Sequence, residues 1–164
     1  TQAKDDPHFY IHNEVGYNYR MTNVQAALGV AQMEELPEFI NRKHKNYDLY
    51  KSLFNGVEHV KLLKFRNGTY SNQWFYSLEL DMDYLKCSMR DVILKLQEQE
   101  IQTRAIWGLI HEQNPYKDSL TYDIKKALYY SDCILNIPCS TQITEEEIMA
   151  VGDAIKKLLA GESK

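Results

Sequence analysis

The chain is poor in the residues that make small cross-linked or metal-dependent folds. Only three of its 164 residues are cysteines, and none has Cys-x-x-Cys spacing: Cys87, Cys133 and Cys139. An odd number of cysteines without that spacing argues against a disulfide scaffold and against a zinc site. The same pattern favours a reducing compartment, so we expect a cytoplasmic protein.

Long apolar runs and blocks of basic residues are missing as well. No segment approaches the length of a membrane span, and no signal peptide or glycine-rich phosphate loop is recognisable. The formal net charge is −4 without a cluster of Lys and Arg, which argues against nucleic acid as a partner. We therefore expect neither a membrane nor a nucleic acid as a partner, and the ordinary hydrophobic content of 44% predicts one globular domain.

What the chain does have is a polar, aromatic loop at Gly16–Thr22 (GYNYRMT), directly before a helix. Thr22 can cap this helix, since Gln25 stands three residues on, at capping-box spacing. Small and apolar residues then recur at helical spacing, which predicts one buried face suited to close approach by another helix or subunit: Val24, Ala27, Leu28 and Ala31.

The remainder predicts a long helix, or two helices in line, over residues 22–55, with Pro37 opening the second piece. Strands are expected at Val60–Phe65, Gln73–Leu80, Ile101–Ile106 and Ile134–Ile137. Helices are expected from Ser88, which opens its helix with Asp91, over about Thr121–Tyr130, and from Thr144, which forms a capping box with Glu147. This order predicts a small, mostly antiparallel sheet covered on one face by helices. Trp74 and Tyr76 are expected to pack in its core, with substrate contact as the lesser alternative.

Three ordered motifs resemble the DegT–DnrJ type nucleotide-sugar aminotransferases, which are pyridoxal-phosphate (PLP) enzymes of fold type I. Matches run from about residue 12 to about residue 158. They centre on Glu14–Leu36 (EVGYNYRMTNVQAALGVAQMEEL), Gln102–Trp107 (QTRAIW) with His111 and Pro115-Tyr116, and Asn136–Ser140 (NIPCS) before Thr144–Ile148 (TEEEI).

The resemblance implies an α/β protein whose chain forms an α+β C-terminal small domain. Residues 1–21 would be an active-site loop region, 22–55 the connecting helix and 56–164 the small domain, with the large PLP-binding domain absent. The chain begins at Thr1 in a polar run, the way a fragment begins, although processing gives the same start.

Transamination needs a lysine that holds PLP and a carboxylate at the pyridine nitrogen. In the resembled family both belong to the part before Thr1. We therefore assign no catalytic residue here, expect PLP to be bound mainly by the missing domain, and expect the chain alone to be inactive.

The loop supplies the cofactor-binding candidates that the resemblance implies. Asn18 is expected to reach across a dimer interface to the cofactor phosphate of the neighbouring subunit, as a side-chain N–H donor. The structural alternative is a turn beside Gly16. Arg20 could pair with that phosphate or with the donor carboxylate, and a salt bridge to Glu14 that fixes the loop is an equal alternative.

The substrate-binding candidates are an aromatic and cationic set. A ring that stacks and a cation that meets a diphosphate suit a sugar nucleotide. A core tryptophan with a rim arginine and a surface histidine is the alternative. No metal site is expected, since His8 and His12 have no third ligand nearby. The candidates are Tyr17, Arg104, Trp107 and His111.

The resemblance implies transfer of an amino group from glutamate to a UDP-linked 4-keto-6-deoxy hexosamine, for surface polysaccharide or glycan synthesis. A homodimer partner subunit is implied as well. Two alternatives stay open: a non-catalytic binding or oligomerisation module, and a lysine-lacking dehydratase or regulatory relative on the same scaffold.

Overall fold

The computed structural model describes residues 17 and 19–161, so Asn18 lies outside the described residues. The chain divides into two compact units, residues 1–37 and 38–164, and each is described by itself. In chain order the elements are α1 (Asn23–Leu53), β1 (Val60–Leu62), β2 (Tyr76–Leu80), α2 (Met82–Leu85), α3 (Met89–Gln97), β3 (Arg104–Ala105), η1 (Ile110–Glu112), α4 (Lys125–Cys133), β4 (Ile134–Ile137) and α5 (Glu145–Leu159).

The long helix α1 begins with the expected capping box. The backbone N–H of Thr22 donates to Gln25 Oε1 at 2.9 Å, and the backbone N–H of Gln25 donates to Thr22 Oγ1 at 3.3 Å. The helix then runs through Pro37 without a break, so the first of the two expected forms, one long helix, is correct. A proline removes only one intrahelical hydrogen bond, and burial of Tyr47 and Tyr50 anchors the helix beyond it.

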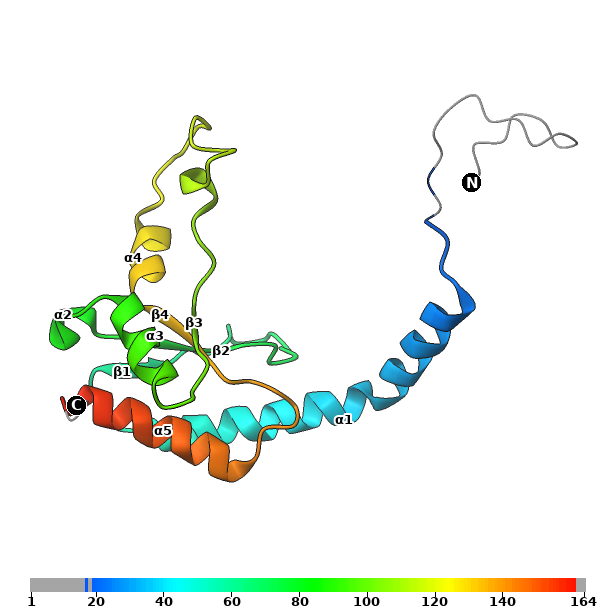
Figure 1. The fold of residues 1–164 in the computed structure, drawn as a ribbon, viewed down its shortest axis with the longest axis horizontal. Helices are drawn as coiled ribbons and strands as arrows, with labels where there is room; N and C mark the ends of the chain where they lie inside the picture. The colour runs from blue at the N-terminus through cyan, green and yellow to red at the C-terminus, as the bar shows by residue number, and fades with distance from the viewer. Residues whose placement is uncertain (1–16, 18, 162–164) are drawn as a thin grey trace, which may run out of the picture. The chain divides into compact units, whose positions relative to one another are not determined.

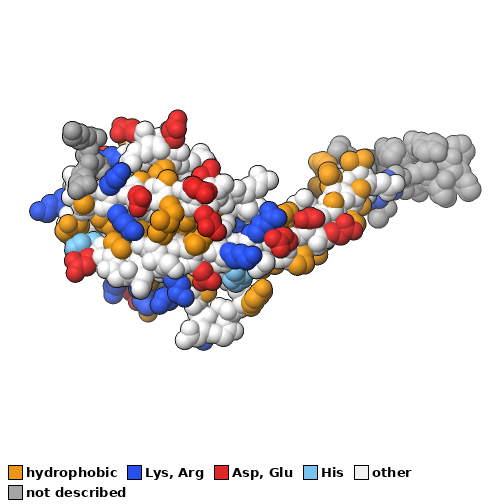
Figure 2. All heavy atoms as spheres, turned by 90° about the horizontal axis from the view of Figure 1, so that it is seen from below, with side chains coloured by type: hydrophobic (Ala, Val, Ile, Leu, Met, Phe, Trp, Pro, Cys, Tyr) orange, Lys and Arg blue, Asp and Glu red, His pale blue; other side chains and the backbone are white. Residues whose placement is uncertain are grey.

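The described chain does not itself bury the first half of α1, so no other helix of these residues covers the expected apolar face, and its burial by another subunit stays a prediction. Val24 is 71% exposed and Leu28 is 65% exposed, and Val30 and Met33 are exposed as well. Figure 2 shows hydrophobic side chains gathered on the N-terminal part of this helix, followed by charged ones. The apolar side chains lie at the surface, and nothing within the described residues covers them.

The sheet has the order β1-β2-β4-β3 and is antiparallel at every pair. Because side chains alternate along a strand, one face collects the apolar residues of β1 and β2 together with Leu135 and Ile137 of β4. That face forms the core with the buried sides of α1, α3 and α5, whose members are in the same cluster. Among its fully buried side chains are Tyr76, Leu78, Leu135, Leu96 and Ile155.

Helices α1 and α5 lie side by side beneath the sheet (Figure 1). Their close approach depends on Gly152 of α5, because a Cβ there would stand 3.0 Å from Leu53 Cδ1 of α1. Thr144 and Glu147 make the expected capping box at the start of α5, as Ser88 and Asp91 do for α3. The expected mostly antiparallel sheet with helices on one face is confirmed.

Element ends differ from the expectations where tertiary contacts decide them. The strand expected from Gln73 begins only at Tyr76, because Gln73 has a φ of 53° that interrupts extended backbone. Trp74 therefore lies before the strand and is 63% exposed, so its expected core position is wrong, whereas Tyr76 is buried. Helix α2 and the short 3-10 turn η1 were not expected at all.

Among the helices of residues 17 and 19–161, none combines the length and the apolar character needed to cross a membrane.

Candidate functional site

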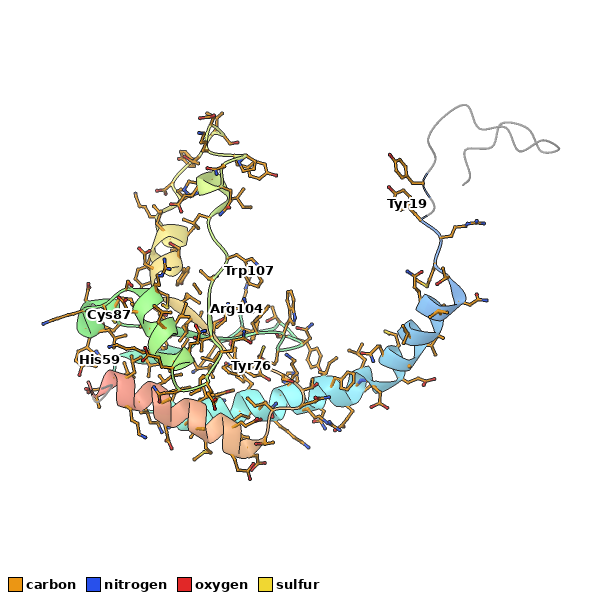
Figure 3. The ribbon with its side chains drawn as sticks, in the orientation of Figure 1. Tyr19, His59, Tyr76, Cys87, Arg104 and Trp107 are labelled. Atoms are coloured by element: carbon orange, nitrogen blue, oxygen red, sulfur yellow. The ribbon has the colours of Figure 1, made fainter. Side chains whose placement is uncertain are left out.

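A pocket of about 570 Å³ lies where the edge strand β3 meets the segments before β2 and after β4. Two of the expected substrate residues, Arg104 and Trp107, line it together. Both come from the stretch that runs outward from β3, where Figure 3 labels them. The structure thus brings these two candidates into one pocket, although their roles remain predictions.

Three aromatic side chains, Trp74, Phe75 and Trp107, form what we call the aromatic corner. The rings of Phe75 and Trp107 meet edge to face, with centroids 5.1 Å apart and an interplanar angle of 85°. The Trp74 ring lies 4.6 Å from Phe75 and 6.2 Å from Trp107. Both tryptophans are nearly two-thirds exposed, so they keep ring surface open for stacking against a planar ligand.

Arg104 lies on the sheet face opposite the core, in register with Asn136 of β4. The Ser77 hydroxyl donates to Asn136 Oδ1 at 2.6 Å, and Asn136 Nδ2 donates to the Ala105 carbonyl at 3.5 Å. The side-chain hydrogen bonds between β2, β4 and β3 at this place are therefore made by neutral groups, without the Arg104 guanidinium. Within residues 17 and 19–161, no hydrogen bond or ion pair engages the exposed Arg104 guanidinium. A cation in this state can bind a phosphate or carboxylate with two parallel hydrogen bonds.

Thr103 also lines the pocket, and sequence reasoning missed it. The residue is only 6% exposed, and its hydroxyl oxygen has no hydrogen-bond partner among the described residues. A buried hydroxyl without a partner is costly, which marks this wall as one that suits a polar ligand atom. Its position beside Arg104 was the only sequence signal available for it.

Phe75 was missed too, because it was treated as part of a buried strand with Trp74. Its neighbour Trp74 was considered for substrate contact only as the lesser alternative, and the structure places both at the pocket's aromatic corner. A run of adjacent aromatic residues cannot alternate wholly into a core, and this was the signal that could have found them.

The remaining candidates are not part of this pocket's lining. His111 lies in η1, half-buried, with its Nε2 3.9 Å from Glu112 Oε1. Tyr17 and Arg20 belong to the unit of residues 1–37, where both are exposed and the Tyr17 ring lies 6.0 Å from that of Tyr19. Asn18 lies outside the described residues.

Metal ligation receives no support from the part of the chain that the structure describes. There, no three or more His, Cys, Asp and Glu side chains are grouped in a way that could hold a metal ion.

The fold is a helix-covered antiparallel domain, and its pocket carries an exposed guanidinium beside aromatic rings. The chain belongs to the DegT/DnrJ/EryC1/StrS aminotransferase family, whose model matches residues 2–156. A GDP-perosamine synthase of Caulobacter vibrioides is 32% identical in an alignment 164 positions long, which covers 96% of this chain and 43% of that protein.

Solved structures share the fold. Helicobacter pylori PseC, an aminotransferase involved in the biosynthesis of pseudoaminic acid, matches with a TM-score of 0.81 at 18% identity, over 96% of this chain and 43% of that one. Spr1654 from Streptococcus pneumoniae in its PLP form matches with a TM-score of 0.73 at 20% identity, over 87% and 36%. The chain spans about two fifths of the length of the curated relatives it matches.

Proposed function

We propose that the protein carrying this chain is a PLP-dependent aminotransferase that converts the keto group of a nucleotide-linked sugar into an amine, in the cytoplasm and with glutamate as the amino donor. Residues 56–164 would be its C-terminal small domain, joined by the helix of residues 22–55 to a PLP-binding domain that is not in this chain. Family membership supports the reaction class, and the names of the relatives support a nucleotide sugar as the substrate.

The observation that carries the proposal for this chain is the pairing of Arg104 with the aromatic corner in one pocket. A nucleotide sugar presents a planar base and a diphosphate, so it needs a stacking surface and a cation close together. Trp107 would stack on the base, and Arg104 would bind the diphosphate.

The nucleotide itself is the finer part of the proposal. The resemblance in the motifs around Trp107 and Asn136 favours a UDP-linked 4-keto-6-deoxy hexosamine. Relatives named for a UDP-linked altrosamine are 22% identical, whereas GDP-perosamine synthases reach 32%. We keep UDP as the proposed base and make GDP the competing outcome of the test.

The donor set of the polar loop fits a phosphate-bearing cofactor. Tyr17 and Arg20 are exposed, and a phenol and a guanidinium are good hydrogen-bond donors to phosphate. PLP supplies the electron sink that allows an amino group to be transferred. We propose that Asn18 and Arg20 bind the cofactor phosphate of a neighbouring subunit. Tyr17 and His111 would contact the substrate.

A test compares binding of UDP and GDP to this chain by isothermal titration calorimetry. We expect UDP to bind, and Arg104→Gln to weaken binding about tenfold, the equivalent of about 1.4 kcal/mol for a lost charge-assisted contact. Arg90→Gln, at an exposed arginine of α3, is the matched control and should bind as the original chain does. Tighter binding of GDP than of UDP would change the proposed nucleotide from UDP to GDP, and binding of neither nucleotide would contradict the proposal.

The activity is tested on the whole protein with glutamate and a 4-keto-6-deoxy sugar nucleotide, with the amino sugar detected by mass spectrometry. The chain alone should form no amino sugar. It should also give no borohydride-stable PLP adduct at one specific lysine. Stoichiometric labelling of a single lysine would contradict the proposed division of labour.

We also propose a homodimer, in which the exposed apolar side chains of the first half of α1 meet the partner subunit. Those side chains include Val24, Leu28 and Met33, and association would remove their apolar surface from water. Leu28→Asp in the whole protein should lower the mass measured by analytical ultracentrifugation, whereas Lys51→Asp, at an exposed site on the second half, should not. A dimer unchanged by Leu28→Asp would place the interface elsewhere.

A further inference from the structure

The turn after β4, Pro138–Ser140, is held by side chains from a single face of α1. The three donors stand at i, i+3 and i+7, which places them on one side of a helix. Each donates to a different carbonyl of three consecutive residues. The bonds run from Lys43 Nζ to the Cys139 carbonyl at 2.6 Å, from Asn46 Nδ2 to the Ser140 carbonyl at 3.2 Å, and from the Tyr50 hydroxyl to the Pro138 carbonyl at 3.1 Å.

Lys43 differs from the other two donors because it also reaches a second segment. Its Nζ donates to the Trp74 carbonyl at 2.9 Å, as well as to that of Cys139. Trp74 belongs to the aromatic corner, and Phe75 and Cys139 both line the pocket. One ammonium group therefore joins two walls of the pocket that are 65 positions apart along the chain, from Trp74 to Cys139.

The Lys43 side chain is itself fixed from the sheet. The Tyr76 hydroxyl donates to the Lys43 backbone carbonyl at 2.8 Å, and the Tyr76 ring centroid lies 5.7 Å from Nζ. Burial raises the pKa of the Tyr76 phenol, so it stays protonated and able to donate at neutral pH. This support limits the positions that the ammonium can take.

An ammonium in this place is an unusual choice for stability alone. Lys43 is half-buried, and across residues 17 and 19–161 no carboxylate lies within ion-pair distance of it. Taking a charge out of water without a counter-charge costs free energy. An apolar side chain would avoid the cost of desolvating a charge but would leave the carbonyls of Trp74 and Cys139 without this donor, so the ammonium has a role that an apolar residue cannot perform.

We propose that Lys43 is a positioning residue for the nucleotide pocket. By holding the carbonyls of Trp74 and Cys139, it sets the separation between the aromatic corner and the Pro138–Cys139 wall, and so the space that the planar base enters. The nature of the ligand rests on the proposed function, whereas the clamp between the two walls rests on the hydrogen bonds alone.

The test uses the fact that the chain has two tryptophans, and that both lie in the aromatic corner with centroids 6.2 Å apart. The longest-wavelength bands of the near-ultraviolet circular dichroism, where tryptophan absorbs and the 12 tyrosines do not, therefore report the corner. Lys43→Met should reduce that signal while the far-ultraviolet helix signal stays the same. The dissociation constant for UDP should rise about tenfold, since small displacements of binding groups have large effects.

Lys45→Met is the matched control, because Lys45 is exposed on the same helix. It should leave both the tryptophan signal and UDP binding unchanged. In the whole protein, Lys43→Met should raise KM for the sugar nucleotide about tenfold with kcat changed less than about threefold, a split that general loss of folded protein would not produce.

The outcomes separate the two proposals. If the unaltered chain binds neither UDP nor GDP, the proposed function fails, whereas a reduced tryptophan signal in Lys43→Met still supports the clamp. A Lys43→Met chain with unchanged signal and unchanged UDP affinity overturns the role of Lys43, as does an equal loss in Lys45→Met. If Lys43→Met does not fold, Lys43→Gln replaces it, because its shorter donor cannot span both carbonyls, and the same two measurements decide.

Discussion

The two halves of helix α1 share one backbone and differ in what surrounds them. In the second half, Tyr47 and Tyr50 are buried against the sheet. In the first half, the large apolar residues Val24, Leu28 and Met33 are exposed. Both halves carry large apolar side chains, so the difference lies in whether the described residues supply a partner for them.

This difference shows where the stability of the chain resides. Most helical stability in proteins comes from tertiary packing of an apolar face, and little comes from intrinsic propensity. The second half of α1 has such packing and also donates the hydrogen bonds that hold the pocket wall. Within the described residues the first half has no such packing, and the subunit interface that we propose would supply it.

A leucine-to-alanine substitution, made once in the packed sheet and once in the first half of α1, tests this comparison most directly. Leu135→Ala, in the central strand β4 where Leu135 is fully buried, should lower the free energy of unfolding by about 3 kcal/mol. Leu28→Ala in the first half of α1 should change it by less than about 0.5 kcal/mol. Urea denaturation of this chain measures both. A Leu28→Ala loss similar to that of Leu135→Ala would show that the chain already buries the first half.

Removal of one tyrosine hydroxyl from the buried part of α1, and of one from the exposed loop before it, gives a second comparison with a smaller expected change in stability. Tyr50→Phe removes the donor to the Pro138 carbonyl and leaves that acceptor without its partner, so we expect a loss of about 1.5 kcal/mol. Tyr19→Phe, at a side chain that is 90% exposed, should be neutral. Equal effects in urea denaturation would mean that the Tyr50 hydroxyl exchanges its bond for water without cost.

Local signals in the sequence predicted the ends of three helices correctly. Helix starts at Thr22, Ser88 and Thr144 were all expected, and a capping box is present at each. Such motifs involve residues three positions apart, so nothing distant is needed to recognise them. The antiparallel sheet with helices on one face was also predictable, because the order of strands and helices along the chain indicated it.

Long-range contacts decided what the sequence could not show. The break before β2 depends on the left-handed backbone of Gln73, and no residue type there announces it. In the pocket, Arg104 and Trp107 were predictable because they stand three positions apart in one motif. Phe75 and Lys43 reach the pocket from other segments, so their roles required the folded chain.

The capping boxes at the starts of α1 and α5 should respond differently to loss of their threonine. Thr144→Ala removes the acceptor for the backbone N–H of Glu147 at the start of α5 and should cost about 1 kcal/mol of global stability. Thr22→Ala should fray the first turn of α1 with little change in the urea midpoint, because that turn is outside the packed core. Hydrogen exchange of the first-turn amides would detect the fraying, and a shifted midpoint for Thr22→Ala would contradict the expectation.

The smallest effect concerns pH and a carboxylate at the surface of the packed unit. A hydrogen bond with His59 at 2.9 Å, followed by the backbone N–H of Tyr84 at 3.1 Å, lowers the pKa of Asp81. A carboxyl whose pKa is lower in the folded chain stabilises the fold above its ordinary value of 3.8, and this contribution is lost as the pH falls through the folded pKa. The urea midpoint should therefore fall below about pH 4, and Asp81→Asn should make that fall shallower. Asp118→Asn, at an exposed carboxylate of the loop before α4, serves as the control. If both variants kept the pH dependence of the urea midpoint seen in the original chain, Asp81 would have no part in the acid transition. Its pKa would then be the same in the folded and the unfolded chain.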